Sequence, residues 1–317
     1  MRSLASPLIV LGAGGKMGPT LAVLAKRAAQ EAGTGLDVIA VSRFSNPASR
    51  DWLEARGVRT LVCDVLDRSS LDVLPDTQNL IYLVGVKFGT AQNPALTWAA
   101  NTLAPAHVAE RFPGARIVAL STGNVYPFVP VAGGGTQEDE PLTPLGEYAN
   151  AAVARERLFD YFSRQNGVRV ALIRLNYAVE LRYGVLVDLA RKVWAGEEID
   201  VANGFLNCIW QGDANDMILR ALPLATAPTS AWNLTRPGPL RVRNAASRFG
   251  ELLGKTPVFV GKEADTALLN NPEKLCSVLG PPPMPLETIF RWTAHWVKIG
   301  GRDLRKPTHF EVRDGKY

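Results

Sequence analysis

The stretch Leu8-Ile9-Val10-Leu11-Gly12-Ala13-Gly14-Gly15-Lys16-Met17-Gly18 decides the fold of this chain. It begins with a short apolar run typical of a buried strand, and Pro19–Ala32 follows with apolar residues at helical spacing. Between them, Gly12 permits a tight turn, Gly15 lets the backbone approach a pyrophosphate, and Gly18 lets the helix pack closely on the strand. Free N–H groups at the helix start would face the phosphates. The stretch predicts a dinucleotide-binding turn, and a plain glycine-rich turn is the alternative.

Apolar runs continue along the chain in alternation with helical patterns. We expect helices at Trp52–Arg56, Ala95–Arg111 and Tyr148–Gln165, and further buried strands at Val38–Ser42, Thr60–Cys63, Leu80–Val84, Ile117–Ser121 and Val168–Leu175. Such alternation is typical of parallel strands whose two faces are covered by helices. The predicted fold class is therefore α/β, with a Rossmann-like doubly wound parallel sheet.

The regular alternation of strand and helix patterns ends after Asn176. We expect helices at Gly184–Ala195 and Asp213–Leu222, a strand at Ala231–Thr235, and a proline-rich, irregular remainder. The predicted division is an NAD(P)-binding Rossmann domain at residues 1–176, completed by about 207–236. Residues 177–206 and 237–317 would then form a smaller C-terminal lobe that binds the substrate.

Composition narrows the class of protein. With 317 residues, 47% of them hydrophobic and 21% charged, the chain resembles an ordinary globular protein. A net charge of +5 without a dense Lys/Arg run argues against a nucleic-acid partner. The chain lacks an apolar stretch of about 18 residues, which argues against a membrane span.

The cysteines and histidines add little chemistry. The three cysteines, Cys63, Cys208 and Cys276, have no close spacing, so we expect no disulfide framework and a cytoplasmic location. The three histidines are far apart in sequence, so no metal is expected. The predicted partner is a small-molecule substrate, and a homodimer is left open.

Several later motifs follow the glycine turn in a recognisable order. They are Cys63-Asp64-Val65 after the third strand, Asn101 in the next helix, Ser121-Thr122-Gly123-Asn124-Val125-Tyr126, Tyr148, and Asn207–Asp213. Together with the spacing Gly-x-x-Gly-x-x-Gly, they make the chain resemble the extended short-chain dehydrogenase/reductases. The resemblance is to their NAD-dependent epimerase/dehydratase branch, and it covers about the first 240 residues.

The resemblance implies roles for single residues. Asp64 would cap the adenine of the cofactor, and Asn101 matches a structural asparagine. Thr122 falls on the catalytic Ser/Thr and Tyr148 on the catalytic tyrosine, while Glu156 matches an acidic residue eight positions later.

One departure bears directly on catalysis, because Ala152 replaces the lysine of the family's Tyr-x-x-x-Lys pair. In the family this lysine binds the nicotinamide ribose and lowers the pKa of the tyrosine. We nominate Lys87 as the substitute, since Val84-Gly85-Val86-Lys87-Phe88-Gly89 resembles the loop of UDP-galactose 4-epimerase that carries a lysine near the cofactor. The alternative is that Lys87 neutralises phosphate or is solvated. Arg155 is expected to be a surface charge.

Two other departures concern the substrate. Gly123-Asn124 cannot supply the acid/base pair that nucleotide-sugar 4,6-dehydratases carry after the threonine. Leu206 stands where many sugar-nucleotide enzymes place an arginine, so a diphosphate-linked sugar would lose a charge-assisted anchor. Arg174, Arg182 and Arg236 are candidates to compensate for that loss.

The choice of cofactor depends on Val41-Ser42-Arg43-Phe44 after the second strand. An NAD enzyme usually places an acidic residue here, whereas Ser42 and Arg43 suit a 2′-phosphate, so NADP is favoured and NAD remains an option. The predicted cofactor-binding residues are Gly12, Gly15, Lys16, Met17, Gly18, Ser42, Arg43, Asp64, Val65, Val84, Gly85 and Lys87.

Two functions are compatible with these residues. The first is hydride transfer at a carbinol or ketone carbon of a small polar substrate, a sugar among the options. Tyr148 would be the general acid/base, Thr122 would hold the substrate oxygen, and Lys87 would supply the cation. The second is an NAD(P)-binding sensor or pseudoenzyme that lost turnover with its lysine.

Overall fold

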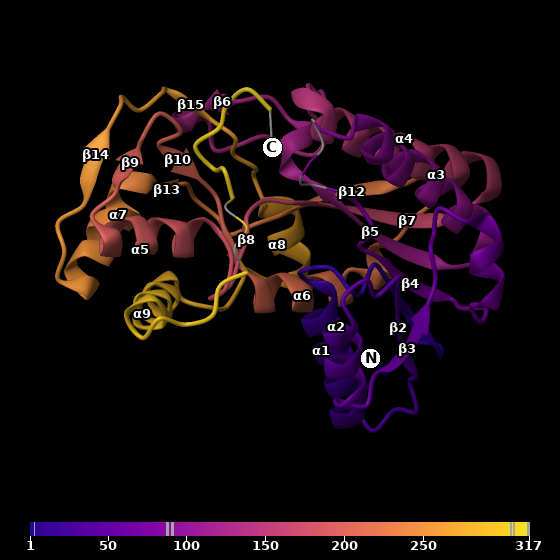
Figure 1. Ribbon diagram of the computed structural model, residues 1–317. Coiled ribbons are helices and arrows are strands. Elements are labelled where there is room, and N and C mark those ends of the chain that lie inside the picture. Colours follow the sequence, from indigo (N-terminus) through magenta and orange to yellow (C-terminus); the bar gives the residue numbers. More distant parts are fainter. Residues whose placement is uncertain (3, 87–88, 90–91, 305, 307, 316–317) are drawn as a thin grey trace. The chain divides into compact units, whose positions relative to one another are not determined.

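The computed structural model describes residues 1–317 except 3, 87–88, 90–91, 305, 307 and 316–317 (Figure 1). The chain divides into two compact units. The first consists of Met1–Thr122, Gly146–Arg174 and Asn215–Trp232, and the second of Gly123–Leu145, Leu175–Ala214 and Asn233–Tyr317.

The first unit carries a seven-stranded sheet in the order β12-β7-β5-β4-β1-β2-β3. Its strands are β1 (Leu8–Leu11), β2 (Val38–Ser42), β3 (Arg59–Val62), β4 (Asn79–Tyr82), β5 (Arg116–Thr122), β7 (Arg169–Leu175) and β12 (Ser230–Leu234). β1 pairs in parallel with both β2 and β4, and parallel pairing continues to β3 and to β5. The predicted doubly wound sheet is confirmed, because the chain winds outward from β1 in both directions.

Helices cover both faces of this sheet. They are α1 (Gly18–Glu31), α2 (Pro47–Glu54), α3 (Pro94–Arg111), α4 (Gly146–Asn166) and α6 (Gln211–Arg220), with short 3-10 turns at Arg68–Val73 and Leu222–Leu224. Alternate strand residues such as Ile9, Ile39 and Leu80 form one hydrophobic core with Val108 of α3 and Phe159 of α4. α3 and α4 therefore cover that face together (Figure 1). α1 packs on β1 and β2, and its Thr20 hydroxyl accepts a hydrogen bond from Asn215 Nδ2 of α6 (3.0 Å).

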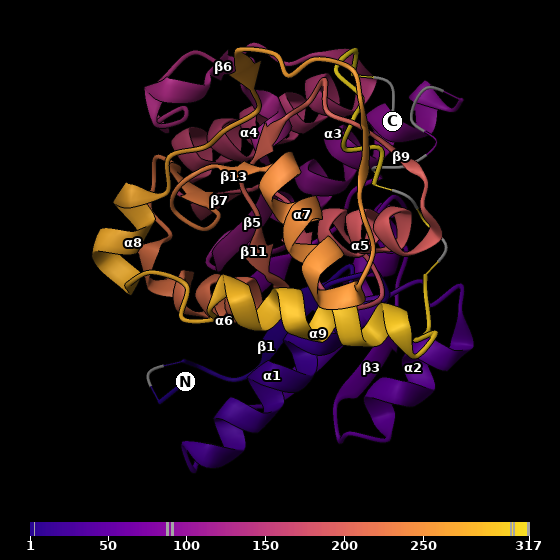
Figure 2. The same cartoon turned by 90° about the vertical axis from the view of Figure 1, so that its left-hand side faces the viewer.

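The second unit combines short strand pairs with helices. β6 (Val129–Pro130) pairs with β15 (Thr266–Ala267), β8 (Ala178–Val179) with β11 (Ile209–Trp210), β9 (Glu198–Asp200) with β14 (Val258–Val260), and β10 (Phe205–Leu206) with β13 (Leu240–Arg241). 3-10 turns lie at Gly123–Val125 and Val131–Gly133. The helices are α5 (Val185–Ala195), α7 (Val242–Leu253), α8 (Glu273–Leu279) and α9 (Leu286–Lys298). Figure 2 shows α5, α7 and α9 gathered together, and their apolar faces form one core.

The prediction of an irregular C-terminal region was wrong. α7 and α9 bury Phe249 and Phe290 against each other edge to face, with ring centroids 5.1 Å apart. Prolines interrupt the sequence between these helices and hide the helical periodicity on either side.

Residues 123–145, which the sequence places with the nucleotide-binding domain, belong to the second unit. Several backbone links to later residues hold them there. β6 pairs with β15, and the Thr136 N–H donates to the carbonyl oxygen of Leu269 (2.8 Å). The segment directly follows Thr122, the last residue of β5, so only tertiary pairing assigns it to a unit.

Candidate functional site

The glycine turn between β1 and α1 is built as the fingerprint requires. Gly12 has φ +79°, and its N–H donates to the carbonyl oxygen of Val41 (2.9 Å). A Cβ at this position would lie 2.9 Å from the backbone of Leu83 and of Val84, so the turn crosses the end of β4 too closely for a side chain. Gly18 is equally restricted, because its Cβ would lie 2.5 Å from Ala13.

The outer side of the turn is open, in contrast. Gly15 is exposed. Leaving aside its two chain neighbours, the described residues place only the carbonyl oxygen of Gly12 (3.3 Å) within 4 Å of a Cβ at this position. α1 begins at Gly18, and the buried Met17 before it makes no side-chain capping hydrogen bond. The backbone N–H groups of a first helical turn point out of the helix, which favours an anionic ligand at this position. Lys16 is half-buried in the same turn.

Ser42, Arg43 and Asp64 lie at the ends of β2 and β3, beside this turn. Ser42 Oγ is 2.7 Å from the point where a Cβ of Gly14 would stand. Arg43 Nη1 lies 3.8 Å from Asp64 Oδ2, and both side chains are largely exposed. The structure therefore brings together two residues that the sequence assigned to the cofactor, in a loose surface pair.

Val65, the next predicted cofactor residue, is buried. Its carbonyl oxygen lies 3.1 Å from His107 Nδ1 of α3, and the hydroxyl of Ser70 donates to the carbonyl oxygen of Asp64 (2.6 Å). These contacts hold the chain after β3 against α3 and against the 3-10 turn that contains Ser70. The Asp64 carboxylate stays at the surface of the first unit.

Two of the three predicted catalytic residues, Thr122 and Tyr148, also lie in the first unit. Thr122 is the buried last residue of β5, and Tyr148 is half-buried in the first turn of α4. Ala152 follows one turn later and is fully buried. Lys87 lies outside the described residues, whereas Val84 is half-buried and Gly85 is exposed.

Glu156 and Arg174 form a buried ion pair. Arg174 Nη2 lies 2.8 Å from Glu156 Oε2, and the hydroxyl of Ser121 donates to Glu156 Oε1 (2.5 Å). The acidic residue that matches the family thus links β5, β7 and α4. Arg174 is committed to this pair and has little freedom to bind a substrate phosphate.

The other two candidate cations are also engaged, both in the second unit. Arg182 Nε lies 3.0 Å from Glu180 Oε2, and Arg236 Nη1 donates to the carbonyl oxygen of Met284 (2.9 Å). Leu206, which replaces the family's arginine, is buried in the core of the second unit.

The prediction that Arg155 is a surface charge was wrong, since only 5% of the residue is exposed. Its Nη1 donates to the carbonyl oxygen of Val84 (3.0 Å), at the end of β4. Helical periodicity could have predicted that Arg155 is buried. It shares one face of α4 with the buried residues Ala151, Ala152 and Phe159.

Comparison with known proteins identifies the family. Residues 8–201, more than half of the chain, match the NAD-dependent epimerase/dehydratase family. The chain belongs to this family. No curated protein sequence matches it at a significant level.

Three solved structures illustrate the fold of this family member. UDP-glucose 4-epimerase of Thermus thermophilus, in complex with NAD, has a TM-score of 0.76 at 18% identity, over 92% of this chain and 99% of that chain. UDP-glucose 4-epimerase of Thermotoga maritima, with UDP-glucose, has a TM-score of 0.75 at 18% identity, over 93% of this chain and 99% of that chain. dTDP-glucose 4,6-dehydratase of Bacillus anthracis, in complex with NAD, has a TM-score of 0.77 at 14% identity, over 93% of this chain and 97% of that chain. At these identities the likeness establishes the shared fold.

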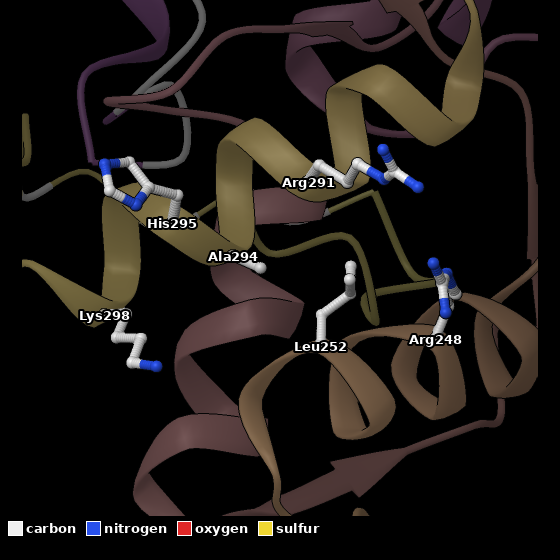
Figure 3. Close-up of a pocket in the computed structure, with 6 residues that line it drawn as sticks. All are labelled: Arg248, Leu252, Arg291, Ala294, His295 and Lys298. Carbon is white, nitrogen blue, oxygen red and sulfur yellow. The ribbon is translucent and has the colours of Figure 1, made fainter.

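A cavity of about 440 Å³ lies within the second unit, between α7 and α9 (Figure 3). It is lined by Arg248, Leu252, Arg291, Ala294, His295 and Lys298, none of which the sequence singled out. Arg248 and Arg291 are both paired with Glu287, so part of the positive charge of the cavity is already neutralised.

Among the described residues, no group of three His, Cys, Asp or Glu side chains is placed to bind a metal ion, and no helix is long and apolar enough to span a membrane.

Proposed function

We propose that this member of the family is an NAD(P)-dependent oxidoreductase or epimerase of the short-chain dehydrogenase/reductase type. It would transfer hydride at a carbinol or ketone carbon of a small polar substrate, with sugars as the favoured class. The observation that carries the proposal is the glycine turn. It is closed toward β4 at Gly12 and open on the outer side of Gly15, next to a helix start without a side-chain cap.

The order of the strands sets how a dinucleotide would lie. With its pyrophosphate at the turn after β1, the adenosine half would extend over the ends of β2 and β3, where Ser42, Arg43 and Asp64 lie. The nicotinamide half would then extend toward β4 and β5, which lie on the other side of β1. In the chain, Val84, Gly85 and Lys87 follow β4. Thr122 is the last residue of β5, and Tyr148 lies in the helix α4 that comes after it.

A bound nicotinamide would supply the hydride donor or acceptor. The chain's own contribution is proton transfer by the Tyr148 hydroxyl and a hydrogen bond from the Thr122 hydroxyl to the substrate oxygen. Lys87 remains our nominee for a cation that contacts the cofactor. NADP is the proposed cofactor, because Arg43 suits a 2′-phosphate.

The proposed substrate class is based on the ligands of similar solved structures and on the residues in which this chain differs from the family. One solved neighbour was determined with UDP-glucose, which supports a sugar substrate. The buried Leu206 and the engaged Arg174, Arg182 and Arg236 argue against a tight anchor for a diphosphate. We therefore favour a smaller polar or sugar-like compound, bound by the second unit.

The described cysteines are free, which supports a cytoplasmic location as part of the proposal.

Calorimetric titration with NADPH and NADH tests the proposal. Gly15→Val places a branched side chain where the pyrophosphate would lie, so binding should be abolished while the fold is kept. Gly114→Val is the matched control, since Gly114 is exposed, has ordinary φ and has no neighbour within 4 Å of its Cβ position. Unchanged affinity in Gly15→Val would refute the dinucleotide site.

Turnover separates the enzyme from the sensor that Ala152 also suggests. We expect NADPH oxidation or NADP reduction with a panel of ketones, alcohols and sugars, and its loss in both Tyr148→Phe and Lys87→Ala. If the wild-type protein binds cofactor without turnover and Ala152→Lys creates it, the sensor is the correct function.

A further inference from the structure

Three buried polar atoms without partners lie in the first unit near the end of β4. They are Tyr82 Oη, Asn101 Oδ1 and Arg155 Nε, none of which has a hydrogen-bond partner within the described part of the chain. Arg155 also affects Tyr82 electrostatically, and it approaches the exposed Gly85. Buried polar groups are nearly always paired, so a cluster of unpaired ones requires an explanation.

The charge of Arg155 is also uncompensated. No carboxylate of the described residues lies within 4 Å of its guanidinium, whose one hydrogen bond goes to the carbonyl oxygen of Val84. Its neighbour in sequence, Glu156, is paired with Arg174 instead. A buried cation without a counter-ion reduces stability, and such groups are retained mainly where function needs them.

The position of Arg155 indicates which function that is. It lies seven residues after Tyr148, and two turns of helix bring both side chains to one face of α4. Its Nη1 lies 2.8 Å from the point where a Cβ of Gly85 would stand, so a glycine is needed at 85 to admit the guanidinium. The charge therefore lies at the carboxyl end of β4, on the side of β1 where the nicotinamide half of a dinucleotide would extend.

We propose that Arg155 is a buried cation of the cofactor site, with a role separate from that of Lys87, our nominee for the lysine that Ala152 replaces. It holds the Val84–Gly85 backbone and places a positive charge near the nicotinamide ring. The oxidised ring carries a positive charge and the reduced ring is neutral, so Arg155 makes the protein bind the reduced cofactor more tightly. This inference rests on the proposed dinucleotide site and adds to it a preference between redox states, with Arg155 as a positioning residue.

Calorimetric titration of NADPH, NADP and ADP into the full-length protein tests the inference. Arg155→Met should lower the preference for NADPH over NADP roughly tenfold, which is the effect of one charge on another about 12 Å away at an effective dielectric constant of about 20. ADP binding should stay unchanged, because ADP fills only the adenosine half. Arg155→Lys should retain the preference, and Arg155→Gln, which keeps an N–H donor for Val84, should lose it.

Controls make each outcome decisive. Arg157→Met removes an exposed arginine of the same helix and should change nothing. If Arg155→Met and Arg155→Gln keep the wild-type ratio of NADPH and NADP affinities, the inference is overturned. Failure of the wild-type protein to bind either dinucleotide would instead refute the proposed function.

Discussion

Arg155 and Arg174 are equally buried, with 5% of each residue exposed, yet their surroundings are opposite. Arg174 pairs with the Glu156 carboxylate, which also accepts from Ser121, so the charge is compensated at every oxygen. Arg155 has one carbonyl partner and an unpaired Nε within the described structure. The first arginine joins three elements of the fold. The second costs stability and lies at the end of the strand next to the glycine turn, which is why we assign it to function.

Breaking the compensated pair should have the largest effect on stability. Arg174→Met leaves the Glu156 carboxylate buried without a cation, which costs about 3–5 kcal/mol in such pairs. Denaturant unfolding followed by circular dichroism measures this cost. Replacing both members, by Arg174→Met with Glu156→Met, should recover much of it. A loss below about 1 kcal/mol in the single variant would show that the pair is not what holds α4 to β7.

The exposed pair of Arg43 and Asp64 sharpens the contrast, because the same chemistry in water contributes little to stability. Arg43→Ala should leave the unfolding free energy within about 1 kcal/mol of wild type. It should however remove most of a preference for NADP over NAD, which we expect to be about 1.5–3 kcal/mol. Comparing the dissociation constants of the two cofactors measures this. Equal affinities in the wild-type protein would show that Arg43 does not discriminate.

Asp188 provides an anionic counterpart to Arg155, within the second unit. It accepts hydrogen bonds from the backbone N–H and the hydroxyl of Thr308 (2.9 and 2.6 Å), but no salt bridge to it is found in the described structure. Burial raises its pKa above the ordinary value of 3.8, although the Thr308 hydrogen bonds oppose the shift.

The folded state therefore holds this proton more tightly than the unfolded chain. Stability should fall as pH rises from 3.8 through the raised pKa, and the cost is fully present above it. Asp188→Asn keeps an acceptor for Thr308 and should give a small gain in melting temperature at neutral pH. The gain should vanish in acid. Melting temperatures of both proteins across pH test this, and a gain that is independent of pH would contradict it.

Much of the first unit could be predicted from the sequence. β1 and β2 were predicted to the residue, and Gly12 and Gly18 have the restricted positions that the glycine pattern implied. These features are local, because each depends on a few consecutive residues. The error at Arg155 has a different cause. Its charge favoured a surface position, while the buried spacing from Ala151 to Phe159 pointed inward.

Other parts depended on contacts that the sequence does not show. Pairing of β6 with β15 places residues 123–145 in the second unit, and the partner strand lies more than 130 residues later in the chain. The engagement of Arg174 likewise depends on Glu156 from another element. Local patterns identify elements well, but only tertiary packing shows which charges remain uncompensated.

Thermal denaturation of the wild type and Arg155→Met, each with and without saturating NADPH, tests the central claim most directly. That claim is that the charge of Arg155 is kept for the cofactor at a cost in stability. Without ligand, the variant should melt at the wild-type temperature or above, because it removes an uncompensated buried charge. With NADPH, the wild type should gain more, since stabilisation grows with ligand affinity. A variant that melts lower without ligand and gains the same increment with NADPH would contradict the account.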